Sequence, residues 1–170
     1  MYSIQSSLYI IGGIVNDGHD VSHVQLYSII DNTCTLISKP MPRPCSLMQA
    51  VSFETSIVLL GEETFFLFNL ETETWDERRQ FRTGCVHFGL VLEDRQVYVI
   101  GGGYSELGED DKITWTCRDD VRFVYLQNII QDKPMKWQSH GKLPKPSFVY
   151  CYSKLTLLDP GLDELECVLL

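Results

Sequence analysis

The chain has 170 residues, of which 44% are hydrophobic and 22% charged, with a formal net charge of −9. This length allows one ordinary domain, and the apolar content excludes a disordered chain. The acidic balance disfavours nucleic-acid binding, which usually needs a basic face. The sequence contains no run of about 18 apolar residues, so no membrane span is expected, and residues 1–5 do not resemble a signal peptide.

The first predicted unit contains three short strands and a proline-rich connector. A strand at 8–11 stops at Gly12 and Gly13, and a polar loop at 14–22 leads to strands at 24–30 and 34–37. Branched and aromatic residues stopped by glycine are typical of a buried strand rather than a helix. Three prolines within 39–44 end this unit, because proline cannot donate a ladder hydrogen bond.

The same order of elements returns twice. The second unit has predicted strands at 47–53, 57–60, 64–70 and 74–77, with a connector at 78–84. In the third unit we expect strands at 85–92, 97–100, 121–127 and 135–138, a long acidic loop at 103–119, a turn at 132–134 and a connector at 140–146. A further unit is expected to begin at 147–158, and the pattern is lost from 159 to 170.

The spacing of matching residues indicates a repeat of about 40 positions. Tyr27 and Phe68 lie 41 residues apart, as do Cys34 and Trp75. Four short antiparallel strands at this period are typical of one blade of a β-propeller. The alternative is a non-repeating β-sandwich with coincidental spacing. Both interpretations predict an all-β fold.

The units resemble the Kelch repeat, which has a double glycine after the second strand, an aromatic residue on the third and a tryptophan on the fourth. The resemblance covers about residues 6–155. Glu62 and Cys34 depart from the pattern, where a second glycine and a tryptophan are expected. The matching residues are Gly12, Gly13 and Tyr27 in the first unit, Gly61, Phe68 and Trp75 in the second, and Gly101, Gly102, Tyr125 and Trp137 in the third.

The resemblance implies a partial Kelch β-propeller with about three blades, at 6–44, 45–83 and 84–146, the start of a next blade at 147–158 and a C-terminal tail at 159–170. Closed propellers have roughly four to eight blades. We therefore expect either a longer protein or association of copies, and the longer protein is favoured. A tryptophan between blades would fill a widening wedge, so Trp137→Ala is expected to cost about 3–5 kcal/mol.

No catalytic, metal or cofactor site is expected. The glycines at 101–103 lack the Lys-Ser/Thr ending of a phosphate-binding loop. The four histidines fit loops and surfaces better than a ligand set, and no G-x-S-x-G motif occurs. The six cysteines show neither a C-x-x-C pair nor zinc-site spacing, which indicates reduced thiols in the cytosol or nucleus.

Candidate partner-binding residues lie in the loops at 14–22, 61–63 and 103–119 and in the connectors, which we expect on one face of a rigid scaffold. Arg78, Arg79 and Arg82 could grip acidic side chains, although solvated charges that balance nearby glutamates are the favoured interpretation. The acidic loop at 106–112 could meet a basic partner or simply be disordered. The other candidates are His19, Tyr104 and Trp115, of which Trp115 is an aromatic in a polar loop.

By resemblance, the chain is expected to be a protein–protein interaction module. In the Kelch-like family, BTB and BACK domains bind cullin-3, and the propeller holds a protein substrate for ubiquitination. No BTB domain is recognisable in this sequence, so cullin-3 would bind through domains outside it. The alternatives are a Kelch scaffold for actin or another cytoskeletal partner and a galactose oxidase-like copper enzyme, whose ligands we cannot place here.

Overall fold

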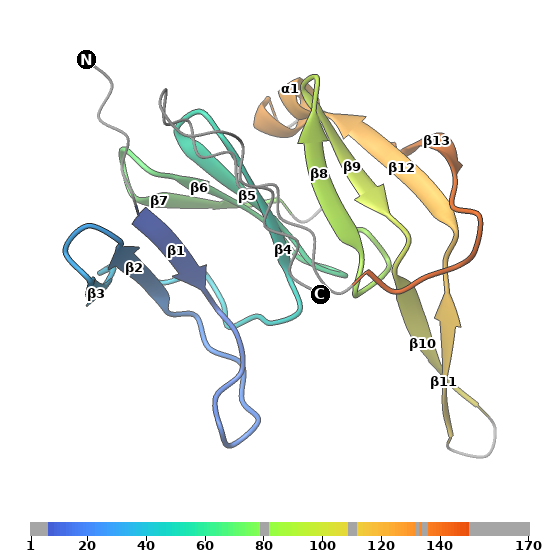
Figure 1. Ribbon diagram of the computed structural model, residues 1–170, viewed down its shortest axis with the longest axis horizontal. Coiled ribbons are helices and arrows are strands. Elements are labelled where there is room, and N and C mark those ends of the chain that lie inside the picture. The colour runs from blue at the N-terminus through green and yellow to red at the C-terminus, as the bar shows by residue number, and fades with distance from the viewer. Residues whose placement is uncertain (1–6, 79–81, 109–111, 132, 134–135, 150–170) are drawn as a thin grey trace.

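The computed structural model describes residues 7–78, 82–108, 112–131, 133 and 136–149. Within these residues the secondary structure is thirteen strands and one short helix, α1 (Leu126–Ile130), and every strand pairing is antiparallel (Figure 1). The predicted all-β class is therefore confirmed.

The strands form three stacked sheets and a separate two-stranded hairpin (Figure 1). The first sheet contains β1 (Ser7–Ile11), β2 (Val24–Ser28) and β3 (Thr33–Leu36). The second contains β4 (Gln49–Phe53), β5 (Ser56–Leu60), β6 (Phe65–Asn69) and β7 (Thr74–Glu77). The third contains β8 (Gly89–Glu93), β9 (Gln96–Ile100), β12 (Asp120–Tyr125) and β13 (Gln138–Lys142).

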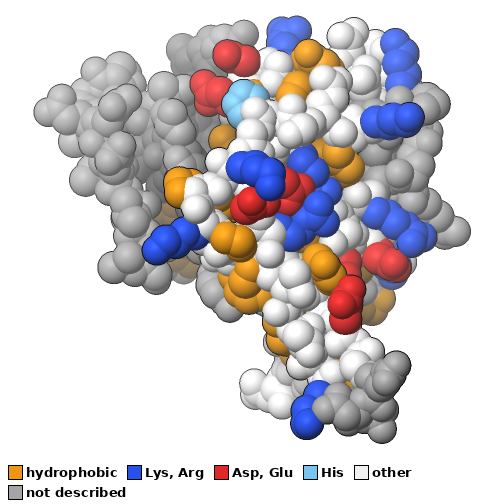
Figure 2. Space-filling model, turned by 90° about the vertical axis from the view of Figure 1, so that its right-hand side faces the viewer, with side chains coloured by type: hydrophobic (Ala, Val, Ile, Leu, Met, Phe, Trp, Pro, Cys, Tyr) orange, Lys and Arg blue, Asp and Glu red, His pale blue; other side chains and the backbone are white. Residues whose placement is uncertain are grey.

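The segment between β9 and β12 corrects one prediction. Most of the expected loop at 103–119 is a β-hairpin of β10 (Gly103–Leu107) and β11 (Ile113–Cys117). It projects from the third sheet in Figure 1 and forms the narrow extension at the bottom of Figure 2. The β-branched and aromatic residues of β11 favour this extended pairing.

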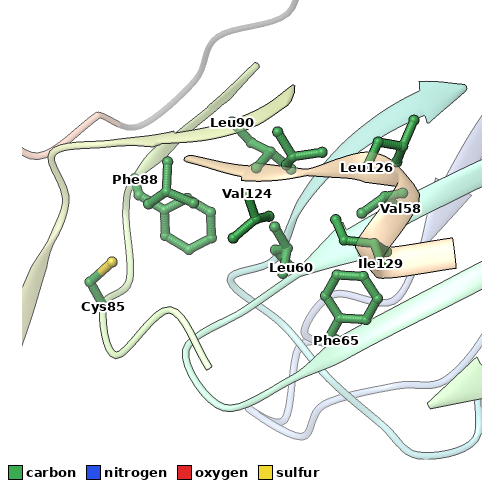
Figure 3. Close-up of a cluster of buried hydrophobic side chains, with 11 residues drawn as sticks. Val58, Leu60, Phe65, Cys85, Phe88, Leu90, Val124, Leu126 and Ile129 are labelled. Carbon is green, nitrogen blue, oxygen red and sulfur yellow. The ribbon is translucent and has the colours of Figure 1, made fainter. Parts of the chain in front are cut away.

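The second sheet lies between the other two, and both of its faces are buried (Figure 1). Ile57 and Leu59 of β5 pack in a cluster that includes Val24 of the first sheet. Val58 and Leu60 point to the opposite face, where they meet residues of the third sheet and of α1 (Figure 3). Because successive strand residues alternate between faces, β5 contributes to two cores and is apolar throughout most of its length.

The three sheets share one register, which explains the spacing seen in the sequence. Phe68 in the second sheet and Tyr27 in the first sheet occupy equivalent positions in this register. In the third sheet this place belongs to Val124, so the prediction of Tyr125 is wrong by one residue, and Tyr125 pairs with Gln96. The equivalent residues pair as Leu8–Tyr27–Cys34, Ile57–Phe68–Trp75 and Val97–Val124.

The paired glycines of the first and third units join each of these units to the chain that follows it. The Gly13 N–H donates to the Cys45 carbonyl at 3.1 Å, and the Gly102 N–H donates to the Ser147 carbonyl at 2.9 Å. Gly102 has a φ of +88°, and a Cβ there would lie 2.8 Å from the Val86 carbonyl oxygen. This position therefore requires glycine.

Trp75 on the outer strand β7 and Trp137 just before the outer strand β13 each bond to the connector before their sheet. The Trp75 indole N–H donates to the Lys39 carbonyl at 3.1 Å, and that of Trp137 to the Arg82 carbonyl at 2.9 Å. Trp75 also stacks on Phe68 with 4.4 Å between ring centroids. Trp137 is only partly buried, so we now expect Trp137→Ala to cost less than the value predicted for a buried side chain.

The outer part of the third sheet also differs from the prediction. Residues 126–130 form α1, and the outer strand is β13 (Gln138–Lys142) rather than 135–138, so the expected connector at 140–146 begins later. A register shift between Val121 and Arg122 accommodates the displaced strand. The predicted tail at 159–170 and most of the predicted unit at 147–158 lie outside the described residues.

Candidate functional site

The longer connections gather at one end of the stacked sheets, which we call the loop end. Because the strands alternate in direction, the loop at 12–23, the β10–β11 hairpin and the connectors between sheets all emerge there (Figure 1). Six exposed large hydrophobic residues belong to these segments, namely Ile14, Val15, Leu47, Leu107, Ile113 and Trp115. Clustered exposed apolar side chains are typical of an interaction surface.

The hairpin presents most of this apolar surface. Leu107 pairs with Ile113, and Ser105 pairs with Trp115, so these four side chains share one face. Leu107, Ile113 and Trp115 are 70%, 65% and 50% exposed. Tyr104 lies on the opposite face, since its neighbour Ser105 pairs with Trp115. The hairpin therefore carries an apolar face that the rest of the described chain leaves largely uncovered.

The base of the hairpin is held firmly, which an isolated two-stranded ribbon would need in water. Gly103 and Val86 exchange two backbone hydrogen bonds, of 2.8 and 2.9 Å. The Trp115 ring lies edge-on to Phe148 at 5.9 Å and tilted against His87 at 6.2 Å between centroids. A Cβ at Gly103 would lie 2.3 Å from the Phe148 ring, so only glycine admits this packing.

A charged network fixes the chain where it leaves the hairpin and enters β12. Arg118 donates two hydrogen bonds to the Asp120 carboxylate, at 2.7 and 3.0 Å, and the Arg122 Nε lies 2.7 Å from Asp120 Oδ2. Burial alone would raise the pKa of Asp120, but the hydrogen bond from Arg118 and the charges of Arg122 and Arg118 hold it below its usual 3.8. Figure 2 shows acidic and basic side chains interleaved in the middle of one face.

The network reaches the core through a buried thiol. The Arg122 Nη2 donates to the Cys85 Sγ at 3.4 Å. Burial raises the pKa of the Cys85 thiol above its usual 9.0, although the charge of Arg122 and a hydrogen bond with Thr83 oppose this rise. The thiol is therefore neutral at pH 7, which suits a structural rather than a reactive cysteine.

Replacing Asp120 with Asn should lower the free energy of unfolding by about 1–3 kcal/mol at pH 7, because two partly buried guanidinium groups lose their counter-charge. The pKa of Asp120 is lower in the folded chain than its usual 3.8. The stabilisation by Asp120 is therefore fully present above pH 3.8, and it is lost as the pH falls below 3.8 and through the lower pKa of the folded chain. Urea unfolding of both proteins at pH 7 and at about pH 3 tests this.

Asp119→Asn is the matched control. Asp119 pairs with Lys142 at 3.0 Å, but the Lys142 side chain is 74% exposed. Such a surface pair contributes at most about 1 kcal/mol. Two results would contradict the role assigned to the network. One is a loss of unfolding free energy in Asp120→Asn no larger than that in Asp119→Asn, and the other is a loss in Asp120→Asn that is as large at about pH 3 as at pH 7.

The arginines predicted to bind a partner have partners within the chain. Arg78 lies 2.6 Å from Asp76 and its side chain is 12% exposed. Arg82 forms an exposed ion pair with Glu63 at 3.1 Å, and Arg79 lies outside the described residues. Arg82 is thus an exposed charge paired with a glutamate, as the favoured interpretation expects, whereas Arg78 is little exposed and pairs with an aspartate instead.

The remaining predicted residues divide between two segments of the loop end. His19 lies in the loop at 12–23, where its backbone N–H donates to Asp17 Oδ1 at 3.2 Å. Tyr104 and Trp115 lie on the hairpin, on opposite faces. Sequence reasoning missed Leu107 and Ile113. The signal was available, because Ile113 begins a run of β-branched and aromatic residues typical of a strand.

Within the described part of the chain, no three His, Cys, Asp or Glu side chains are placed to hold a metal ion. No helix in that same part is long and apolar enough to cross a membrane.

Comparison with known proteins finds solved structures that share the fold, but no family. No family model and no curated protein matches the chain. Among solved structures, 98 chains match. One of them, "Structure of YjhT", superposes with a TM-score of 0.58 at 13% sequence identity, over 85% of this chain and 52% of that chain. What the two share is the fold. The present chain spans about half the length of that relative.

Proposed function

We propose that this chain is a protein-recognition module, a partial Kelch-type β-propeller that captures another protein at its loop end. The observation that carries the proposal is the anchored hairpin with Leu107, Ile113 and Trp115 exposed on one face. Aromatic and aliphatic side chains on a rigid support are typical anchors of protein interfaces.

Three features support the propeller interpretation. The sheets stack with one shared register at a repeat of about 40 residues, as in a radial array of blades. The second and third sheets each have four strands, in the orders β4-β5-β6-β7 and β8-β9-β12-β13. The paired glycines and indole hydrogen bonds recur between successive units.

The composition of the hairpin suggests the chemistry of its partner. The apolar face would receive aliphatic or aromatic side chains. The connection between β10 and β11 is acidic in sequence, with Glu109, Asp110 and Asp111, and Glu106 adds a carboxylate on the other face. Complementary potentials speed encounter and select partners. The favoured partner is therefore a protein segment with apolar anchors next to basic residues.

The Kelch resemblance supports a cellular setting in the cytosol or nucleus. There the module would hold a substrate for ubiquitination, with cullin-3 bound by BTB and BACK domains outside this chain. The second candidate setting is a cytoskeletal scaffold, for example one that binds actin.

Proximity labelling in cells tests the proposal. The triple variant Leu107→Ser/Ile113→Ser/Trp115→Ala should lose its specifically labelled proteins by about tenfold or more, because it removes the anchors of the hairpin. The control Ile29→Ser/Ile30→Ser changes two exposed residues in the turn after β2, at the other end of the sheets. It should label the same proteins as the wild type.

Two outcomes decide between the settings. A neddylation inhibitor should increase the abundance of a labelled ubiquitination substrate, whereas a cytoskeletal partner should be unaffected and co-sediment with filaments. Identical labelling by the hairpin variant and the wild type would contradict the assignment of the site.

A further inference from the structure

The β10–β11 hairpin is a ribbon of only two strands, so within the described part of the chain each of them has one edge that no third strand covers. The hairpin projects beyond the stacked sheets (Figure 1), and most side chains of both strands are exposed. An edge strand presents a row of unpaired N–H and C=O groups, with which another chain can pair.

The hydrogen bonds at the two ends of the hairpin show which residues direct their backbone groups outward. At the base, the Arg118 N–H donates to the Gly102 carbonyl at 2.8 Å, and near the tip the Gly108 N–H donates to the Lys112 carbonyl at 2.9 Å. Bonded and non-bonded pairs alternate in an antiparallel ladder, so the even-numbered residues bond across the hairpin. The odd-numbered residues therefore direct their N–H and C=O groups toward the two outer edges.

The β10 edge is partly occupied and carries a charge. Gly103 is an odd-numbered residue, and both its N–H and its C=O bond outward to Val86, at 2.9 and 2.8 Å. Farther along the strand, Glu106 adds an exposed carboxylate. Charged side chains on an edge strand disfavour pairing with another chain. The β10 edge is therefore the less suitable of the two for a further strand.

The β11 edge has neither of these protections. Ile113, Trp115 and Cys117 direct their backbone groups toward it, and no residue of β11 is charged or a proline. The strand is rich in β-branched and aromatic residues, which favour extended pairing. Ile113 and Trp115 also carry exposed apolar side chains. The same residues therefore offer hydrogen-bonding groups along the edge and apolar contacts on one face.

We propose that the partner binds the β11 edge as an added strand, through an extended segment that becomes the third strand of the hairpin. Unpaired N–H and C=O groups at every second residue match the backbone of an extended segment, whereas a helix bonds its own backbone groups. The inference rests on the proposed function of the hairpin and adds to it the conformation of the bound segment.

The alternation of side chains also sets the sequence pattern of this segment. Residues placed beside Ile113 and Trp115 would be apolar, and they would stand two positions apart in the partner. The residue between them would lie on the opposite face, beside Thr114 and Thr116, and would be polar. The partner segment is therefore expected to alternate between apolar and polar residues.

Selection from a displayed library of random peptides, each of about twelve residues, tests this pattern. Peptides that the wild type enriches and the Leu107→Ser/Ile113→Ser/Trp115→Ala variant does not should carry apolar residues at every second position. Apolar residues spaced three and four positions apart would indicate a bound helix and overturn the proposal. Enriched peptides that bind both proteins equally would instead contradict the proposed function of the hairpin.

Ile113→Pro tests the contribution of the backbone at the β11 edge. Proline removes the outward N–H of residue 113, which makes no hydrogen bond across the hairpin. The selected peptide should bind this variant about tenfold more weakly than Ile113→Ala, which also loses the isoleucine side chain but keeps the donor. Equal affinities for the two variants would overturn the proposal and leave the hairpin as the recognition surface.

Amide hydrogen exchange of the wild type tests the same pairing without a substitution. Addition of the selected peptide should slow exchange at Ile113 and Trp115 by about tenfold or more, and should leave Ser105, whose N–H points to the β10 edge, unchanged. Equal slowing at both edges, or slowing at neither, would overturn the proposal. A dimer of the chain alone that Ile113→Pro abolishes would also overturn it, because the β11 edge would then belong to a second copy.

Discussion

Phe68→Ala is expected to lower the free energy of unfolding by about 3–5 kcal/mol, the largest effect among the substitutions considered. The Phe68 side chain is fully buried between the first and second sheets, where it stacks on Trp75 and lies edge-on to Tyr9 at 6.2 Å. Truncation would leave a cavity that three elements line. Chemical denaturation followed by circular dichroism measures the loss.

Tyr27→Ala is the matched control, because Tyr27 occupies the same register position in the first sheet. Its side chain lies on the outer face of that sheet, and its hydroxyl donates to Asn32 Oδ1 at 2.5 Å. This change should cost only about 1 kcal/mol, mainly the hydrogen bond. Equal losses for both variants would show that the second sheet is not packed between its neighbours as described.

Gly102→Ala is expected to cost about 2–5 kcal/mol, for two reasons that add. Alanine is strained at a φ of +88°. In addition, its Cβ would lie 2.8 Å from the Val86 carbonyl oxygen and 2.9 Å from the Phe88 Cβ, in a well-packed part of the chain. Denaturation curves should show a lower midpoint with an unchanged slope.

Gly13→Ala separates these two causes. Gly13 follows β1 as Gly102 follows β9, and its φ is +109°, but a Cβ there meets nothing within 4 Å. We therefore expect only the strain, of about 1–3 kcal/mol. A Gly13→Ala loss as large as that of Gly102→Ala would mean that backbone conformation alone requires the glycines, and that close approach contributes nothing.

The sequence predicted the strands well where one local signal was sufficient. The run from Ser56 to Leu60 is short, apolar and stopped by Gly61, and it forms β5 as expected. The glycines after β1 and β9 were also found, because positive φ and close backbone approach leave little choice of residue. The offset of 41 residues then located Tyr27 and Phe68 at equivalent positions.

The errors arose where the structure depends on contacts between distant residues. The sequence predicts a loop where the hairpin lies, because its acidic connection and short strands give a weak local signal, whereas Gly103, Val86 and Phe148 hold its base. Tyr125 is the aromatic residue that the repeat pattern predicts on this strand, but the register, not the residue type, decides equivalence and assigns the position to Val124.

The short helix and the displaced outer strand have the same explanation. Five residues are too few for a helical period to be recognised in a sequence. α1 is stabilised instead by burial of Leu126 and Ile129 against the second and third sheets. The displaced strand β13 needs the register shift at Val121, for which the sequence carries no marker.

Calorimetric titration of the most strongly labelled partner against the purified chain tests the central claim most directly, that the apolar face of the hairpin is the recognition surface. Wild type and Arg82→Ala should bind with the same affinity, because Arg82 already pairs with Glu63. The Leu107→Ser/Ile113→Ser/Trp115→Ala variant should bind at least about tenfold more weakly. Undiminished binding by the hairpin variant, or loss of binding in Arg82→Ala alone, would contradict the account.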